Sequence, residues 1–577
     1  MAASAHGKND PTANKASALA ALIAENASQP SGPRRESLNA LRKAVGHYKK
    51  GEWAPAAIAA AEAADADAKS SSAFHLLALA LDNLGQRHKA FEMYERALAL
   101  DPHDPDLYLN IGTAAWSLKM YDGAENAFRA YIELRPDCSK GYNNLAGCLR
   151  DKGQLDDAIA LCRDTLMRLP QAADLWNTLG TIMGEVCEFD NAATFYKEAL
   201  RLDPKMARAY HNLAYALNHV GPLEEAIANY TRALELCGNE NDRAEIIHAR
   251  GFSFLAQGRL AEGWAEYEAR HLPHFSQSNH FAVAAPRWDG EDLNGRKLLV
   301  VGEQGLGDEI MFAGLIPDLI ERVGPQGKVM IACDHRLVPL FQRSFRETHV
   351  GLSMHTHHNA KPVRVVHWAQ GDMKPDFYTP MGSPLGMLRK TVEDFPRTAF
   401  LKPDPDRVRF WRDRLEALGP GPYVGICWRS MLQTTQRKKF FSALEQWRPV
   451  LEKTSVKFIN IQYGDAKAEI DSVREKFGVA IHDFDDLDLK MNLDDNAALC
   501  AALDLAVSAP TAAGAIAAGT GTETWFLLAA PQGWTQLGTD HYPWYANTRV
   551  LAPEKFGDWP SVLKRLGKEI ESYAERA

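Results

Sequence analysis

The stretch DLYLNIGTAAWSLKMYDGAENAFRAYIELRP, residues 106–136, decides the fold of the first half of the chain. It contains two apolar–polar runs in which apolar residues recur every three or four positions, the spacing of an amphipathic helix. Gly112 in the first run and Ala124 in the second are small, so the two helices can approach closely, and Pro136 stops the second helix. The stretch therefore predicts a pair of packed helices.

The same pattern recurs six times at a spacing of 34 residues. Small residues occupy the position of Gly112 at Ala44, Ala78, Gly112, Ala146, Gly180 and Ala214, and the matching alanines are Ala56, Ala90, Ala124, Ala158, Ala192 and Ala226. One helix pair cannot bury its apolar stripe without the next pair, so the units must stack. The pattern resembles the tetratricopeptide repeat, or TPR. A seventh unit, 244–270, has lost the register by three residues and is expected to cap the stack.

Asparagines recur near the small residue of the first helix in several units, at Asn110, Asn143, Asn144, Asn177 and Asn212. TPR stacks present a concave surface to a peptide or a partner helix, and a side-chain amide there can hold an extended backbone. The alternative is that these asparagines are only solvated groove residues. The pattern does not choose between the two interpretations.

Composition excludes several classes of protein. The 577 residues are 46% hydrophobic and 24% charged, which is typical of a folded multidomain protein. A net charge of -9 argues against nucleic acid or an anionic membrane as the main partner. The eight cysteines form no CxxC pair, and the N-terminus lacks a signal-peptide pattern, so we expect a cytoplasmic protein.

The second half of the chain changes to short apolar runs that alternate with helical stretches. RKLLVVGE (296–303), GKVMIAC (327–333) and VRVVHWA (363–369) predict strands of one parallel sheet that is buried on both faces. A second series follows, with YVGICWRS, SVKFINIQ, VAIHDF, LDLAVSA and ETWFLL between 423 and 528. Two such α/β halves would leave a cleft between the carboxyl ends of their strands.

A glycine-rich turn follows the first of these strands and precedes a helix. It comprises Gln304, Gly305, Leu306, Gly307 and Asp308. The glycines allow a ligand to approach the backbone closely, but the turn lacks the third glycine of a dinucleotide fingerprint and the GK[ST] of a P-loop. Asp308 has two interpretations: an N-cap of the helix, or a general base at the cleft.

The segments PRWDGEDLNGRKLLVVGEQGLGDEIMFA, VGICWRS and LDLAVSAPTAAGAIAAGTGTETWFLL together resemble the heptosyltransferase-like glycosyltransferases. The match spans about residues 285 to 555. It implies a GT-B fold of two Rossmann-like halves, and it implies that the glycine-rich loop faces the acceptor with Asp308 as the catalytic base. No metal and no cofactor are implied. We interpret the histidines at 355, 357 and 358 as part of an exposed polar loop and not as a ligand set.

The resemblance assigns the second half to the activated sugar. It implies a donor site made of Trp428, Arg429, Ser430, Gln462, Tyr463, Pro510, Thr511, Ala512 and Ala513. An arginine fork such as Arg429 can meet a phosphate or a carboxylate, although a strand-end arginine is often only an ion-pair partner. The basic run Arg437, Lys438, Lys439 can assist, although a solvated loop is the more frequent explanation of such a run.

The chain departs from this family at one point. The family usually has an aspartate and, five residues later, a histidine where the nucleotide sugar binds, whereas this chain has Pro510 and Ala515. The phosphate contacts must therefore differ from those made to a nucleoside diphosphate sugar. A CMP-linked nonulosonic acid, which has one phosphate and its own carboxylate, is one explanation, and loss of activity is another.

A TPR stack fused to such a transferase resembles the flagellin glycosyltransferases of alphaproteobacteria. That resemblance implies a protein O-glycosyltransferase that binds flagellin through its repeats and transfers pseudaminic acid, or a related nonulosonic acid, to Ser or Thr hydroxyls. The alternatives are a TPR adaptor or chaperone with a degenerate transferase half, and a TPR-type N-acetylglucosamine transferase, although the nucleotide motifs of the latter are not found here.

The expected organisation has four parts. These are a flexible tail at 1–36, a TPR solenoid at 37–270, a linker and acceptor-side half at 271–404, and a donor-side half at 405–577. The expected fold class is thus an all-α superhelix followed by an α/β GT-B transferase.

Overall fold

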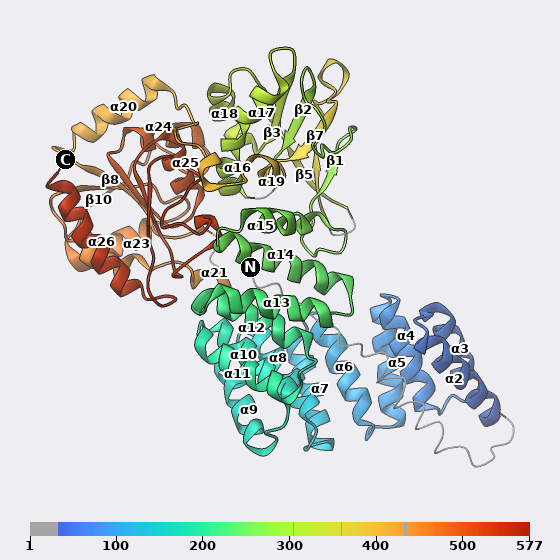
Figure 1. Cartoon of the computed structure of the whole chain (residues 1–577). Coiled ribbons are helices and arrows are strands. Elements are labelled where there is room, and N and C mark those ends of the chain that lie inside the picture. Colours follow the sequence, from blue (N-terminus) through green and yellow to red (C-terminus); the bar gives the residue numbers. More distant parts are fainter. Residues whose placement is uncertain (1–32, 304, 359–360, 432–434, 577) are drawn as a thin grey trace. The chain divides into compact units, whose positions relative to one another are not determined.

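The computed structural model describes residues 33–303, 305–358, 361–431 and 435–576 (Figure 1). The first 32 residues of the expected tail lie outside this range. The chain divides between Asn212 and Leu213 into two compact units, which we describe separately.

The first unit is an all-helical TPR superhelix. Its helices are α2 (Pro33–Lys49), α3 (Trp53–Ala66), α4 (Ser71–Asn83), α5 (Arg87–Leu100), α6 (Pro105–Ser117), α7 (Tyr121–Leu134), α8 (Ser139–Lys152), α9 (Leu155–Arg168), α10 (Ala173–Glu185) and α11 (Phe189–Leu202). α12 (Ala207–Val220) spans the division between the units. The alanines of the 34-residue pattern are fully or almost fully buried, as close helix packing requires.

Two glycines explain why the pattern demands small residues. A Cβ on Gly112 would lie 2.5 Å from Cε1 of Phe128, and a Cβ on Gly180 would lie 2.7 Å from Cε1 of Tyr196. In both repeats the aromatic ring of the second helix therefore occupies the space that a side chain of the first helix would fill. The repeat is built by pairing a missing side chain with a large one.

The second unit begins with helices of the repeat type. α13 (Leu223–Leu236) is followed by α14 (Glu240–Ala256), α15 (Leu260–Tyr267) and the 3-10 turn η1 (Glu268–His271). Leu255, Leu260 and Trp264 belong to the same buried core as the α/β part of the chain. The indole of Trp264 donates a 2.8 Å hydrogen bond to the carbonyl oxygen of Arg389. The seventh helix pair is therefore built into the α/β core.

The first α/β half contains a four-stranded parallel sheet in the order β4-β3-β2-β7. The strands are β2 (Lys297–Val301), β3 (Lys328–Cys333), β4 (His349–Leu352) and β7 (Phe377–Pro380), and the helices are α16 (Leu306–Phe312), α17 (Ile316–Val323), α18 (Val338–Ser344) and α19 (Leu385–Leu388). β2 and β3 are almost wholly buried, which accounts for their continuous apolar sequence.

Two expectations for this half were wrong. VRVVHWA does not join the parallel sheet: β6 (Lys361–Val365) lies between β1 (His280–Ala282) and β5 (Met354–His358) in a separate sheet, and it runs antiparallel to β5. The three histidines lie on β5 and not in a loop. β5 is exposed along its whole length. Because none of its side chains has to be buried, its sequence lacks the apolar pattern by which a strand is predicted.

The second α/β half contains a six-stranded, wholly parallel sheet in the order β10-β9-β8-β11-β12-β13. The strands are β8 (Tyr423–Cys427), β9 (Lys457–Asn460), β10 (Ile481–His482), β11 (Leu505–Ser508), β12 (Thr524–Leu527) and β13 (Thr548–Leu551). The helices are α20 (Pro405–Glu416), α21 (Thr435–Lys438), α22 (Arg448–Leu451), α23 (Lys467–Phe477), α24 (Leu493–Ala502), α25 (Ala512–Thr520) and α26 (Trp559–Ala574).

This strand order is that of a doubly wound nucleotide-binding sheet. The chain starts in the middle at β8, runs outward to β10, and returns to β11 on the other side of β8. The strand order therefore reverses between β8 and β11. In such sheets ligands bind beyond the carboxyl ends of the strands at this point.

None of the helices within the described ranges is both long enough and apolar enough to cross a lipid bilayer.

Candidate functional site

The glycine-rich turn connects β2 to α16. Gly305 is the N-cap of α16, and Asp308 occupies the third helical position, so the N-cap interpretation of Asp308 was wrong in its position. The carboxylate nevertheless has a capping role, because Oδ2 of Asp308 accepts a 3.3 Å hydrogen bond from the Gly305 amide. Leu306 and Gly307 form the first turn of α16, and Gln304 lies outside the described residues.

Asp308 is half-buried, and its surroundings disfavour ionisation. The pKa of this carboxyl is raised from 3.8 to about 6, mainly by burial and in smaller part by the charge of Glu303. The Gly305 hydrogen bond and the charge of Arg437 oppose this shift. A carboxyl with a pKa of about 6 is mostly ionised at neutral pH and is a better proton acceptor than an ordinary aspartate.

The start of α16 lies directly against the start of α25 in the other α/β half. A Cβ built on Gly307 would lie 3.6 Å from the backbone nitrogen of Ala512 and 3.8 Å from the carbonyl carbon of Thr511. These are ordinary contact distances, so a side chain at position 307 would just touch the backbone at the start of α25. The structure thereby brings the predicted acceptor loop close to two predicted donor residues, Thr511 and Ala512.

The start of α25 carries no charged side chain. Thr511 is the N-cap but makes no side-chain capping bond, and its hydroxyl lies 3.4 Å from both Cys427 Sγ and Ser508 Oγ. Ala515, in the position of the family histidine, is 5% exposed and belongs to the core. Pro510 is exposed. A ligand at this helix start would therefore meet backbone N–H groups of the first turn.

Arg429 is held by an acidic partner. Its Nε donates to Oε1 of Glu469 at 2.8 Å, and its Nη2 bonds the same oxygen and the carbonyl of Asp465. The indole of Trp428 donates to Glu469 Oε2 at 2.6 Å. The structure thus favours the ion-pair interpretation of Arg429 over that of a donor ligand.

Gln462 fixes the turn that follows β8. Its side-chain oxygen accepts hydrogen bonds from the backbone amides of Trp428 (3.1 Å) and Arg429 (3.0 Å), and the residue is 1% exposed. Tyr463 is half-buried; burial raises the pKa of its phenol, and a hydrogen bond with the buried Ser430 opposes that shift. Buried Gln462 therefore holds the backbone of this turn in place, whereas the side chain of Tyr463 is partly accessible to solvent.

Arg437 is a cation close to the candidate base. It lies on α21, is half-buried, and its charge lowers the pKa of both Asp308 and Tyr463. Lys438 beside it is exposed. From the sequence, a solvated loop was the favoured interpretation of the run 437–439, whereas in the structure the charge of Arg437 acts on a residue of each α/β half, Asp308 and Tyr463.

The repeat asparagines form hydrogen bonds between successive repeats, to residues 35 positions away. Asn110 bonds His75 at 2.8 Å, Asn143 bonds Thr178, and Asn212 donates to Asn177 at 3.0 Å. Asn110 and Asn177 are buried, so solvation does not explain them. For these four residues the amide is engaged in joining repeats, which leaves half-buried Asn144 as the best candidate to contact a peptide.

No cluster of three His, Cys, Asp or Glu suited to a metal occurs among the residues that the structure describes. His355 on β5 instead lies with Nδ1 3.1 Å from Nη1 of Arg364.

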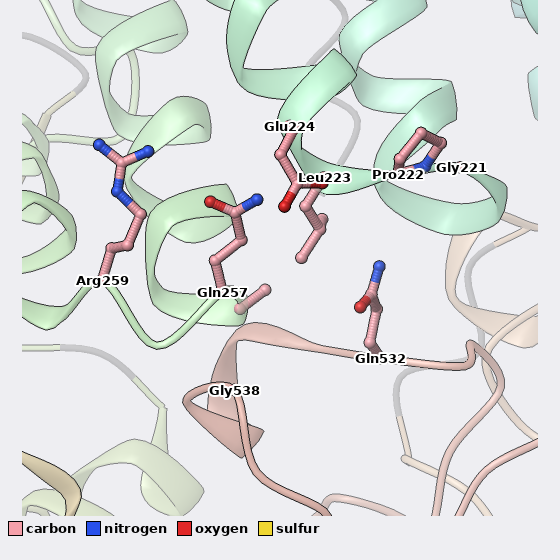
Figure 2. A pocket seen from close by; sticks show the side chains of 9 residues that line it. Gly221, Pro222, Leu223, Glu224, Gln257, Arg259, Gln532 and Gly538 are labelled. Carbon is pink, nitrogen blue, oxygen red and sulfur yellow. The ribbon is translucent and has the colours of Figure 1, made fainter.

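A cavity of about 640 Å³, which sequence reasoning missed, lies between the repeat-type helices and the second α/β half (Figure 2). Its walls are the α12–α13 turn, the α14–α15 turn and the loop between β12 and β13. Figure 2 shows Glu224, Gln257 and Gln532 pointing into it from these three segments. None of its lining residues was predicted from the sequence, because they come from turns far apart in the chain.

Comparison with known proteins identifies the repeats of the first half of the chain. The tetratricopeptide repeat model matches residues 75–137, 109–173 and 188–241, so the first unit is a TPR array, a structure that mediates binding between proteins. Among solved structures, the chain is similar to Pseudomonas aeruginosa pilF (17% identity, TM-score 0.31, covering 37% of this chain and 98% of that one) and to yeast Tom70 (18%, 0.35, 46% and 55%).

A curated relative covers nearly the whole chain. Protein FlbA of Caulobacter vibrioides is 37% identical over 535 residues, which span 92% of this chain and 90% of that protein. The similarity therefore includes both the TPR array and the α/β part. The chain belongs to the family of protein FlbA.

Proposed function

We propose that this protein is an O-glycosyltransferase that binds an acceptor protein through its TPR array and transfers a sugar from a nucleotide donor to Ser or Thr hydroxyls. The observation that carries the proposal is the close approach of Gly307 to Ala512, which brings the loop of Asp308 beside a helix start at the reversal point of a doubly wound sheet. A carboxylate with a raised pKa thus lies beside a place suited to a nucleotide phosphate.

In the proposed reaction, Asp308 removes the proton of the acceptor hydroxyl while the oxygen attacks the anomeric carbon of the sugar. The bond between that carbon and the phosphate oxygen breaks, and the nucleotide leaves with the bonding electron pair. Asp308 acts as a base only when ionised, so transfer requires a pH above its pKa of about 6. Arg437 and the N–H groups of α25 stabilise the negative charge of the departing phosphate.

We propose a CMP-linked nonulosonic acid, such as a pseudaminic acid donor, as the sugar nucleotide. The start of α25 offers backbone N–H groups and no charged side chain, and Arg429 is neutralised by Glu469. One phosphate is therefore easier to accommodate than two. The carboxylate of the sugar would need a cation of its own, and Arg437 lies close enough to Asp308 to act on either group.

We propose flagellin as the acceptor and the cytoplasm as the place of reaction. Both follow from the resemblance to flagellin glycosyltransferases. The decisive experiment compares the intact mass of flagellin produced with this protein and its donor pathway to that of flagellin produced without the protein. Addition of a nonulosonic acid mass is expected, and unmodified flagellin in both samples would contradict the proposal.

A second candidate is a TPR adaptor whose transferase half is inactive. Two observations favour it: the carboxylate of Asp308 caps α16, and Arg429 is paired with Glu469. Thermal stabilisation of the protein by CMP, CDP or UDP separates the candidates, because only a working donor site binds nucleotide. CMP alone should stabilise the protein. Stabilisation by UDP would instead favour an N-acetylglucosamine transferase, and no stabilisation would favour the adaptor.

A further inference from the structure

A buried ion pair joins the last repeat-type segment to the strand that carries the candidate site. Arg270 lies in η1 and Glu303 follows β2, and the side chains are 4% and 2% exposed. Arg270 Nε donates to Glu303 Oε2 at 2.9 Å, and Nη2 donates to Oε1 at 3.1 Å. This is the paired geometry in which arginine binds a carboxylate most strongly.

Further bonds satisfy both groups. Glu303 Oε1 also accepts from the Gly382 amide at 2.6 Å, and Arg270 Nη1 donates to the carbonyl of Tyr267 at 2.9 Å. The guanidinium lies 3.9 Å from the centre of the Tyr267 ring. Burial disfavours the charge on Glu303, but Arg270 overcomes this effect and holds the pKa of the carboxyl below its usual value. Glu303 is therefore ionised.

Glu303 lies where the carboxyl ends of two neighbouring strands meet. It lies just beyond the carboxyl end of β2, and Gly382 follows β7, the strand that pairs with β2 in the same parallel sheet. Arg270 also donates to the hydroxyl of Ser383 at 3.1 Å. One guanidinium from the repeat-type segment thus holds the carboxyl ends of two adjacent strands, immediately before the loop of Gly305 and Asp308.

We propose that Arg270 is a positioning residue for the loop that carries Asp308, and that η1, which contains Arg270, is therefore part of the transferase site. The proposal rests on the proposed function. Without Arg270, the Glu303 carboxylate would be buried with no cation bonded to both of its oxygens, and it would have to take up a proton or move toward water. Either change alters the path of the loop and the charge that Asp308 experiences.

The test compares R270M and R270K with R250M as the matched control. Arg250 forms a similar, part-buried ion pair with Glu266 between α14 and α15, but neither residue bonds the strand ends. The first readout is hydrogen exchange of the amides of α16, which needs no activity. We expect at least tenfold faster exchange in R270M, an intermediate value in R270K, and no change in R250M. Equal exchange in R270M and R250M would overturn the proposal.

The second readout is the dependence of kcat/KM on pH with the donor and flagellin. We expect the acidic limb of R270M to shift by at least half a pH unit, with kcat reduced tenfold or more, and R270K to recover part of both. A profile that matches wild type would overturn the proposal. Wild-type protein that transfers no sugar would contradict the proposed function, whereas the exchange experiment would still decide whether Arg270 positions the loop.

Discussion

Glu469 Oε1 lies 2.8 Å from Nε of Arg429, and the same carboxylate accepts the indole hydrogen bond of Trp428. The arginine that the sequence singled out for the sugar nucleotide is thus already neutralised. Removing one member of a buried or part-buried ion pair leaves the other charge without a partner where little water can solvate it, which destabilises the fold. The pair therefore stabilises the turn after β8.

Arg437→Ala is expected to weaken nucleotide binding more than Arg429→Met does. We expect about a tenfold or greater increase in the Kd for CMP in R437A, because a charge-assisted contact contributes roughly 1.5–3 kcal/mol. R429M should lower the Tm but change the Kd by less than about threefold. Isothermal titration of CMP measures both. K438A, with its exposed side chain on the same helix, is the control, and a larger Kd for R429M than for R437A would reverse the assignment.

Asp308→Asn should abolish catalysis and leave donor binding intact. Loss of a general base costs about a hundredfold to ten-thousandfold in rate. In wild type the rate should rise with pH through about 6, because burial raises the pKa of this carboxyl and only the ionised form accepts a proton. Initial rates between pH 5 and 8 test both statements. A fully active D308N, or a rate that falls as the pH rises through 6, would exclude Asp308 as the base.

Glu309→Gln should make the stability of the protein less dependent on pH. Glu309 is buried, its Oε2 accepts the Asp334 amide at 2.9 Å, and burial raises its pKa from 4.5 to about 7. A carboxyl with a raised pKa stabilises the fold when protonated, so this contribution is present below pH 4.5 and is lost as the pH rises to 7. At about 1.4 kcal/mol per pH unit, the loss is about 3 kcal/mol.

Urea unfolding of wild type and E309Q at pH 5 and 8 checks this prediction. Glutamine keeps the oxygen that accepts the Asp334 amide, so the variant should lose less free energy of unfolding than wild type between these two values. E321Q is the control, because Glu321 is an exposed carboxylate on α17. An identical pH dependence in wild type and E309Q would contradict the prediction.

Gly112→Ala should destabilise the TPR array by about 1–3 kcal/mol, the usual cost of overpacking a core. The new methyl group would lie 2.5 Å from Cε1 of the buried Phe128. Gly123→Ala in the same repeat is the control: its methyl group would have no atom within 4 Å, and alanine favours a helix by up to about 1 kcal/mol. Thermal unfolding followed by circular dichroism should give Tm changes of opposite sign, and equal changes would be inconsistent with this packing.

Asn177→Ala and Asn144→Ala should distinguish an asparagine that stabilises the TPR array from one that contacts the acceptor. Asn177 is buried and bonded to Asn212, so its loss should cost about 1 kcal/mol in stability. Asn144 is half-buried, and its loss should leave the Tm unchanged but weaken acceptor binding several-fold. Pull-down titration with flagellin measures the second effect. Unchanged flagellin binding in N144A would leave the asparagines with a purely structural role.

Sequence patterns were sufficient to predict the TPR array and most of the parallel strands. The 34-residue period follows from local packing, since small residues such as Gly112 and Gly180 accommodate an aromatic ring of the adjacent helix. Strands buried on both faces, such as β2 and β8, must be apolar throughout and are therefore visible in the sequence. Exposed β5 and the placement of β6 in a second sheet were missed, because neither depends on local apolar patterning.

The charges that surround the candidate site became known from the folded structure and not from the sequence. It paired Arg429 with Glu469 across 40 residues and Arg270 with Glu303 across 33, and it brought the start of α25 against Gly307. The sequence shows which side chains are charged, but the free energy of a buried charge depends on the partner that folding brings to it. Partners distant in sequence leave no periodic signal, so the roles of Arg270, Glu303 and Arg437 emerged only from the fold.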